Sequence, residues 1–547
     1  MDFAFLNETS DELIFSDEID ILEAPNDEFF LVANSPKIKA EIYAPEINNY
    51  LANSKNNMLE KAKNVKILYE SRALSFDFAT NLPNSQNVGK NVIYASQTPR
   101  KTVVETLRKA GFKVIICKND EVESVYGKIG EIYVQITQDV ETECDFFICE
   151  NTDKKFLTQS GCYEISNLDE NEILELLSKK TPVYEYENFV SYNHKICDFD
   201  GSKTECCGFC ADVCPTVAIL KDKENAKLNF SHIDCVKCAK CVQICPSGAL
   251  ELAKMSIESF EKIAKLYKDR FVILLSEKNL PQNITLPENA LYFVIPNDKF
   301  LKANHFLSIL EQSGQNMIFF TPYLDEITKQ NINFVNKIYD LKFHKTAIIT
   351  VENENELQSA LNKTEKTAYF DIPFVNQNSR EILSQRLGIL VENENFRKIS
   401  LDEHPKFAQI SINEDTCTLC ASCAGACKNG ALIADSEENA IKLNASLCTA
   451  CGACVKSCAE QGTIAIQTNE IDLQKSFFEY QTLAHDELFA CIECGKKFAT
   501  KKSVMRVAGL LKDNFTGDTY KMKSLFCCSD CKAKLMIQKQ LKEQNGN

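Results

Sequence analysis

The chain has 547 residues, too many for a single hydrophobic core, so we expect several domains. Hydrophobic residues make up 44% and charged residues 25%, as in soluble globular proteins, and no run of about 18 apolar residues could span a membrane. The formal charge of −16 disfavours nucleic acid as a partner and favours docking to basic patches on other proteins.

The 26 cysteines are unevenly distributed, with none between Pro246 and Thr416. Grouping at the spacing of metal ligands indicates metal sites in a reducing compartment rather than a framework of disulfides. Residues 1–8 contain neither a basic region nor a long apolar run, so they do not match a signal peptide. We therefore expect a soluble, cytoplasmic protein.

In chain order, an acidic N-terminal segment (residues 1–60) precedes an α/β domain (residues 61–189). Apolar patterning in this domain predicts strands at 65–69, 91–94, 112–117 and 144–149 and a helix at 98–110. Strands that alternate with a helix favour a parallel sheet. Neither a G-x-G-x-x-G nor a G-x-x-x-x-G-K-[ST] motif follows a strand, so the sequence predicts no nucleotide site here.

A second α/β domain (residues 256–400) has expected strands at 271–275, 291–295, 316–320 and 346–351 and helices at 299–312 and 379–387. It contains no cysteine. His305 and His344 each stand alone in the sequence, so we interpret them as packed or solvated residues rather than ligands. The domain is expected to serve as a spacer or a docking surface.

Two cysteine-rich modules, residues 190–255 and 401–470, hold two cysteine runs each. The most complete run has Cys235, Cys238, Cys241 and Cys245 followed by Pro246, which is the C-x2-C-x2-C-x3-C-P spacing of a bacterial [4Fe-4S] site. Three cysteines at this spacing surround one cluster, whereas the fourth leads to the second cluster of a pair. The other runs contain Cys207, Cys210 and Cys214, then Cys417, Cys420, Cys423 and Cys427, and lastly Cys448, Cys451, Cys454 and Cys458.

Each half of a module is expected to contain a strand, a cysteine loop, a short helix and a second strand. In this order of elements the two modules resemble the bacterial 2[4Fe-4S] ferredoxin family. The two copies together cover roughly a quarter of the chain. The resemblance implies one-electron transfer and crossed ligation. Its four ligand sets are Cys214 with Cys235, Cys238 and Cys241; Cys245 with Cys207 and Cys210; Cys458 with Cys417, Cys420 and Cys423; and Cys427 with Cys448, Cys451 and Cys454. Lys428 and Ala459 depart from the family's usual proline, which predicts looser loops there.

One ligand of the cluster at Cys207, Cys210 and Cys245 is missing, because Thr204 stands where the family has cysteine. Cys206 and Cys197 are the two candidates. Neighbouring side chains of an extended segment point to opposite sides, so Cys206 and Cys207 would bind one cluster only with a distorted backbone. Gly201 allows the intervening segment to turn back, and we therefore favour Cys197.

The C-terminal domain (residues 471–547) contains Cys491, Cys494, Cys528 and Cys531, two C-x2-C pairs each expected at a turn. The pairs resemble those of zinc ribbons and treble-clef knuckles, which implies one structural zinc ion held by four thiolates. Cys527 is an alternative ligand to Cys528, and a fifth iron–sulfur cluster is the competing interpretation.

Together these features predict a multidomain α/β protein with two ferredoxin-like (α+β) dicluster modules, a small zinc-ribbon-like C-terminal domain, four [4Fe-4S] clusters and one zinc ion.

The leading hypothesis is a multi-cluster ferredoxin that relays single electrons between cytoplasmic oxidoreductases, without a catalytic motif. The chain also resembles large ferredoxin-like proteins associated with formate dehydrogenase systems, which implies a subunit or accessory factor of a larger redox enzyme. A third hypothesis is an enzyme with a nucleotide or flavin in an α/β domain. Four further cysteines, Cys117, Cys144, Cys149 and Cys162, are interpreted as core residues.

Overall fold

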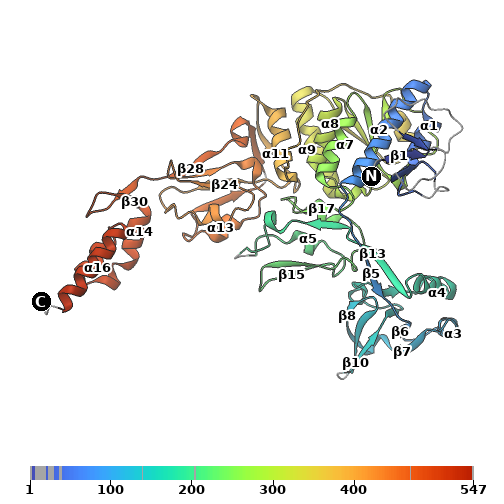
Figure 1. Cartoon of the computed structure of the whole chain (residues 1–547), viewed down its shortest axis with the longest axis horizontal. Coiled ribbons are helices and arrows are strands. Elements are labelled where there is room, and N and C mark those ends of the chain that lie inside the picture. The colour runs from blue at the N-terminus through green and yellow to red at the C-terminus, as the bar shows by residue number, and fades with distance from the viewer. Residues whose placement is uncertain are drawn as a thin grey trace. The chain divides into compact units, whose positions relative to one another are not determined.

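A computed structural model describes residues 3–6, 20–22, 30–35, 40–137, 140–202, 205–468 and 470–544 (Figure 1). Part of the acidic segment 1–60 and Thr204 lie outside the described residues. The chain divides into two compact units: Met1–His194 with Gly208–Asn378 form unit 1, and Lys195–Cys207 with Ser379–Asn547 form unit 2. The segment Lys195–Cys207 of unit 2 therefore lies, in sequence, between the two parts of unit 1.

Unit 1 begins with a parallel sheet and two helices. The sheet has the order β2-β1-β3-β4, with bounds β1 Phe3–Leu6, β2 Asp20–Leu22, β3 Phe30–Ala33 and β4 Ile42–Tyr43, and it leads into α1 (Pro45–Asn53) and α2 (Met58–Asp77). The strand predicted at 65–69 is wrong, because these residues lie inside α2. Val65, Leu68 and Tyr69 are all buried, at the i, i+3, i+4 spacing of a helix face, and a run this short fits either structure.

The first α/β domain contains a four-stranded parallel sheet, as predicted. Its order is β12-β11-β6-β7, and its elements are β6 (Asn91–Ala95), α3 (Lys101–Lys109), β7 (Lys113–Cys117), β11 (Phe146–Cys149), β12 (Cys162–Glu164) and α4 (Glu170–Ser178). An antiparallel sheet of β8 (Val122–Lys128), β9 (Glu131–Ile136) and β10 (Val140–Cys144) is inserted before β11. The strand predicted at 144–149 divides at Asp145, whose carboxylate accepts hydrogen bonds from the N–H groups of Gly89 and Asn91 at 2.8 Å each. Cys117, Cys144, Cys149 and Cys162 are buried in one apolar cluster with Ile93 and Phe147.

The second α/β domain repeats this topology. Its strands are β18 (Phe271–Ser276), β19 (Ala290–Ile295), β20 (Met317–Phe320) and β21 (Ile348–Val351), parallel in the order β19-β18-β20-β21. Numbered along the chain, all three parallel sheets run second, first, third, fourth. Helices α7 (Ile257–Leu266), α8 (Ala303–Ser313), α9 (Glu326–Phe343) and α10 (Glu354–Ala360) accompany the strands, and α7 packs against both α2 and α8. His305 is buried between Phe260 and Phe300, whereas His344 is exposed at the end of α9.

The two cysteine-rich modules share one plan, a pair of two-stranded ribbons with a short helix after each cysteine loop. The first has β14 (Val190–Tyr192) paired with β17 (Leu250–Leu252), β15 (Ile219–Asp222) with β16 (Lys227–Phe230), and helices α5 (Phe209–Asp212) and α6 (Lys240–Ile244). The second has β23 (Gln409–Ile412) paired with β26 (Ile464–Gln467), β24 (Leu432–Asp435) with β25 (Ala440–Leu443), and helices α12 (Ser422–Gly425) and α13 (Ala453–Ser457). The chain is thus a mixed helix and strand protein.

The remaining elements connect or extend these parts. They are β5 (Pro83–Asn87) paired with β13 (Val183–Glu187), α11 (Ser379–Val391), β22 (Asn395–Ser400) paired with β27 (Glu470–Gln474), β28 (Gln481–His485), β29 (Leu488–Ala490) paired with β30 (Lys497–Thr500), α14 (Lys501–Leu511), α15 (Thr519–Ser524) and α16 (Ser529–Gln544). Among the described residues, no helix combines the length and the apolar character needed to cross a membrane.

Candidate metal centres

Two pockets in the second module are each lined by four cysteines. Cys417, Cys420 and Cys423 share one with Cys458, which comes from the other run of the module. Cys448, Cys451 and Cys454 share the other with Cys427. The pockets group the same cysteines that the ferredoxin resemblance assigns to two clusters, while ligation itself stays a prediction. Isoleucine side chains complete the walls, with Ile412, Ile441 and Ile464 at the first pocket and Ile410 and Ile466 at the second.

A third pocket of this kind lies in the first module. Cys235, Cys238 and Cys241 line it together with Cys214, which belongs to the upstream run. In all three pockets, therefore, the fourth thiol comes from the partner run rather than from its own loop. Four thiols around one small cavity suit a soft metal or an iron–sulfur cluster, because thiolates are the ligands that such groups prefer.

The backbone of three cysteine loops is bent in the same way. Left-handed φ angles recur two and four residues after the first cysteine, at Lys237 and Ala239, at Leu419 and Ala421, and at Ala450 and Gly452. The N–H group of Lys237 donates to the Sγ of Cys235 at 3.4 Å. The corresponding N–H groups of Leu419 and Ala450 interact with the thiols of Cys417 and Cys448. Side-chain-bearing residues rarely adopt this conformation, and here it directs N–H groups to sulfur, which stabilises a thiolate.

Comparison with protein families identifies both modules. Models described as a 4Fe-4S dicluster domain match residues 205–249 and residues 409–459. The chain contains two dicluster segments of the ferredoxin type. Together the matches cover only the cysteine-rich modules, and no curated protein matches the chain. The two dicluster segments therefore carry iron–sulfur chemistry, and an electron-transfer role in general follows from them.

Cys207, Cys210 and Cys245 of the first dicluster segment do not line the pocket at Cys235. Cys210 lies in α5 and Cys245 directly follows α6, whereas the chain passes from unit 2 to unit 1 between Cys207 and Gly208. A lysine that the sequence did not single out accompanies Cys245, since Lys302 donates from Nζ to the Cys245 carbonyl oxygen at 2.9 Å. Burial lowers the pKa of Lys302, and the nearby Cys245 thiol opposes this shift.

The segment 195–207 packs within unit 2, next to the second dicluster segment. The buried carboxylate of Asp198 accepts hydrogen bonds from Asn429 Nδ2 at 2.7 Å and from Thr449 Oγ1 at 2.9 Å. The Cys206 thiol lies beside that of Cys451, and the hydrogen bond between them lowers the pKa of Cys206 to about 6. Cys197 is buried in the same segment. Cys197 as the fourth ligand of the cluster at Cys207, Cys210 and Cys245 stays a prediction.

A buried arginine is the second feature that the sequence did not reveal. Arg380, near the start of α11, donates from its guanidinium to the carbonyl oxygens of Lys406 and Cys448 and stacks 4.0 Å from the centre of the Phe407 ring. Burial lowers its pKa to about 10, although Cys448 and Asp198 oppose this shift. Nothing local in the sequence marks this residue, because it meets Cys448 only in the folded chain.

The C-terminal cysteines form a separate four-thiol group. The ligand atoms of Cys491, Cys494, Cys528 and Cys531 all lie within 4.8 Å of one another. The first pair lies in the turn of the β29–β30 hairpin, and the second lies at the start of α16, where the helix dipole favours a thiolate. Cys527 is fully buried beside them, and its thiol donates to the Lys523 carbonyl oxygen at 3.3 Å. The geometry suits one tetrahedral metal ion, with zinc as a prediction.

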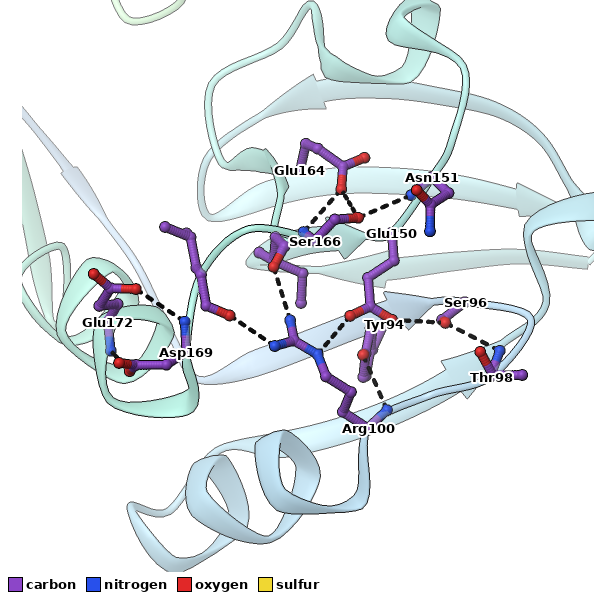
Figure 2. Close-up of polar contacts among 12 residues, drawn as sticks. Tyr94, Ser96, Thr98, Arg100, Glu150, Asn151, Glu164, Ser166, Asp169 and Glu172 are labelled. Atoms are coloured by element: carbon purple, nitrogen blue, oxygen red, sulfur yellow. Dashed lines mark hydrogen bonds and ion pairs between the residues drawn. The ribbon is translucent and has the colours of Figure 1, made fainter.

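The carboxyl edge of the parallel sheet β12-β11-β6-β7 is occupied by the protein's own side chains. Figure 2 shows Arg100 between the ends of β6 and β11, where it pairs with Glu150 at 2.6 Å. Its two terminal nitrogens donate to the carbonyl oxygens of Ile165 and Leu168 at 2.7 Å each, and Ser96 donates to Glu150 at 2.8 Å. Ligands of open α/β sheets bind in this crevice, between strands whose connections run in opposite directions. Here the Arg100 network occupies that place.

Proposed function

We propose that the protein is a multi-cluster ferredoxin that relays single electrons between cytoplasmic oxidoreductases, with four [4Fe-4S] clusters in its two dicluster segments. The observation that carries the proposal is the set of three pockets in which three cysteines of one run meet the fourth thiol of the other. Each cluster, when bound, accepts and releases one electron at a time. Crossed ligation ties the two sites of a segment together, which suits a short relay.

The site residues of this proposal follow the crossed pairing. Cys214, Cys235, Cys238 and Cys241 hold one cluster, and the two pockets of the second segment hold two more. Cys207, Cys210 and Cys245 hold the fourth together with Cys197. Isoleucine walls and N–H groups aimed at sulfur exclude water and stabilise the thiolates, which are the protein's means of setting a reduction potential. Cys491, Cys494, Cys528 and Cys531 hold one zinc ion.

The iron content tests the proposal directly. Protein purified without oxygen is expected to contain about sixteen iron atoms and about sixteen sulfides per chain, together with about one zinc ion, because four clusters and one four-cysteine site are assigned. Elemental analysis and acid-labile sulfide determination measure this. An iron content near eight atoms in fully folded protein would contradict the assignment of two clusters to each segment.

Paired serine variants test the ligand that the first segment lacks. Cys197→Ser is expected to remove one cluster or convert it to a three-iron form, because it takes away one of four thiolates. Cys206→Ser is the matched control from the same short segment, and it is expected to leave the iron content unchanged. Electron paramagnetic resonance of the reduced proteins distinguishes the two. Cluster loss in Cys206→Ser alone would make Cys206 the ligand instead of Cys197.

A further inference from the structure

A cavity of about 830 Å³ lies inside unit 1, beside the first dicluster segment. The residues that follow β18 and β19 form one wall, with Glu277 and Asn297 among them. Helices α2 and α7 form a second wall, and Lys237 and Lys254 of the dicluster segment close the cavity. Its volume is that of a site for a small organic molecule, and the carboxyl edge of a parallel sheet is where such molecules bind in α/β proteins.

One end of this cavity has an excess of positive charge. Lys237 and Lys254 both pair with the single carboxylate of Glu187, at 3.1 Å and 3.0 Å. Elsewhere in the cavity the charges are balanced, because Arg72 and Lys278 stand against Glu46 and Glu277, which both pair with Arg72. Two ammonium groups that share one carboxylate leave room for a further anion, and a phosphate or carboxylate would complete the pairing.

An unsatisfied hydroxyl group lies in the wall formed by the ends of β18 and β19. Ser276, the last residue of β18, is 2% exposed, and its Oγ has no hydrogen-bond partner among the described residues. A buried polar group without a partner is costly, so such groups in folded proteins call for an explanation. A polar atom of a bound molecule would satisfy this hydroxyl.

About half of the remaining lining residues are apolar. Phe189, Leu280 and Val294 are partly exposed, whereas Leu68, Ile263 and Tyr267 are almost fully buried behind the surface. An apolar body therefore fits against the exposed apolar side chains, whereas a bare inorganic anion would leave them uncovered.

We propose that this cavity binds an aromatic monophosphate of nucleotide size, with the phosphate at Lys237 and Lys254 and the ring system against the exposed apolar side chains. Lys237 belongs to the cysteine loop itself, since its N–H donates to the Sγ of Cys235 at 3.4 Å and its carbonyl oxygen accepts from Asn297 Nδ2 at 3.2 Å. The bound molecule thus contacts the residue that touches a ligand thiol. In the sheet β12-β11-β6-β7 the corresponding place is taken by Arg100 (Figure 2).

Flavin mononucleotide and riboflavin form a matched pair of probes, because they share one ring system and only the first carries a phosphate. Titration of the full-length protein under anaerobic conditions, followed by flavin fluorescence, is expected to show binding of flavin mononucleotide at least about tenfold tighter than of riboflavin. Adenosine monophosphate is expected to displace the flavin, whereas inorganic phosphate at the same concentration is not.

Two lysine variants locate the site. Lys237→Gln and Lys254→Gln are each expected to weaken flavin mononucleotide binding about tenfold and to leave riboflavin binding unchanged, since each removes one contact to the phosphate. Lys227→Gln, an exposed lysine of the same segment away from the cavity, is the control and is expected to bind normally. Iron content, measured in parallel, is expected to be equal in Lys254→Gln, Lys227→Gln and the parent protein.

The proposal is overturned if neither flavin mononucleotide nor adenosine monophosphate binds, if riboflavin binds equally well, or if the Lys237 and Lys254 variants bind like the parent protein. None of these outcomes depends on the number of clusters, so the test is independent of the proposed electron relay. Conversely, an iron content near eight atoms would leave the binding result unaffected.

Discussion

Removal of the iron–sulfur clusters is expected to expose both dicluster segments to protease while the parallel sheets of the two α/β domains stay resistant. Chelation of iron under oxidising conditions, followed by limited proteolysis and mass spectrometry, is the measurement. Cleavage within residues 205–249 and 409–459 is expected to accelerate at least about tenfold, because ligation supplies folding free energy that the apo-segments lack. Residues 271–351 are expected to persist as a fragment.

The physical reason lies in the composition of the two kinds of structure. The dicluster segments consist of strands of three or four residues and helices of four or five. Their loops also hold Lys237, Ala239, Leu419 and Ala421 at positive φ, a strained conformation that persists only where the surroundings fix it. In contrast, all six residues of β18 are buried, so that sheet has its own apolar core.

The cluster-loaded protein under the same protease conditions is the control. Both segments are anchored by side chains, because Gln243 donates to Thr328 at 2.7 Å in the first and Arg380 donates to the Cys448 carbonyl oxygen in the second. These bonds are expected to slow cleavage near residues 243 and 448 relative to the rest of each segment. Apo-protein whose dicluster segments stayed resistant would show that their packing, rather than ligation, holds them.

Cysteine spacing predicted the dicluster segments because ligand geometry is local. A cluster needs thiolates at fixed short separations along the chain. The runs that begin at Cys235 and Cys417 can therefore be recognised from the sequence alone. The same holds for the strands at 271–275 and 291–295, which are continuous apolar runs. The apolar run at 65–69 was wrongly predicted as a strand. Five residues are too few to distinguish the periodicity of a helix from that of a buried strand.

Features made by distant residues could not be predicted. The contact between Asp198 and Thr449 joins residues 251 positions apart, and it places segment 195–207 in unit 2. Arg380 meets the Cys448 carbonyl oxygen across 68 positions. The cavity in unit 1 likewise takes Arg72, Glu187 and Glu277 from three separate elements, so no motif could have revealed it.

Cys491→Ser is expected to abolish zinc binding and to destabilise the C-terminal domain, while the iron content stays unchanged. The domain has little apolar core of its own, since its buried cluster consists of four cysteines and Leu535, with Phe498 and Tyr520 packed against them. Met505, Leu510 and Ile537 are exposed instead. We expect a loss of about 5 kcal/mol or more, because structural zinc sites contribute on the order of 10 kcal/mol to the folding of small domains.

Hydrogen exchange of the α16 amides measures this loss without unfolding the other domains, since exchange reports local stability. Cys527→Ser is the matched control: Cys527 is buried in the same cluster, and a serine hydroxyl can still donate to the Lys523 carbonyl oxygen. It is expected to retain zinc and slow exchange, because the four sulfur atoms within 4.8 Å do not include Cys527. If Cys527→Ser loses zinc and Cys528→Ser retains it, Cys527 rather than Cys528 is the zinc ligand. A parallel loss of about four iron atoms in Cys491→Ser would instead identify the site as a fifth cluster.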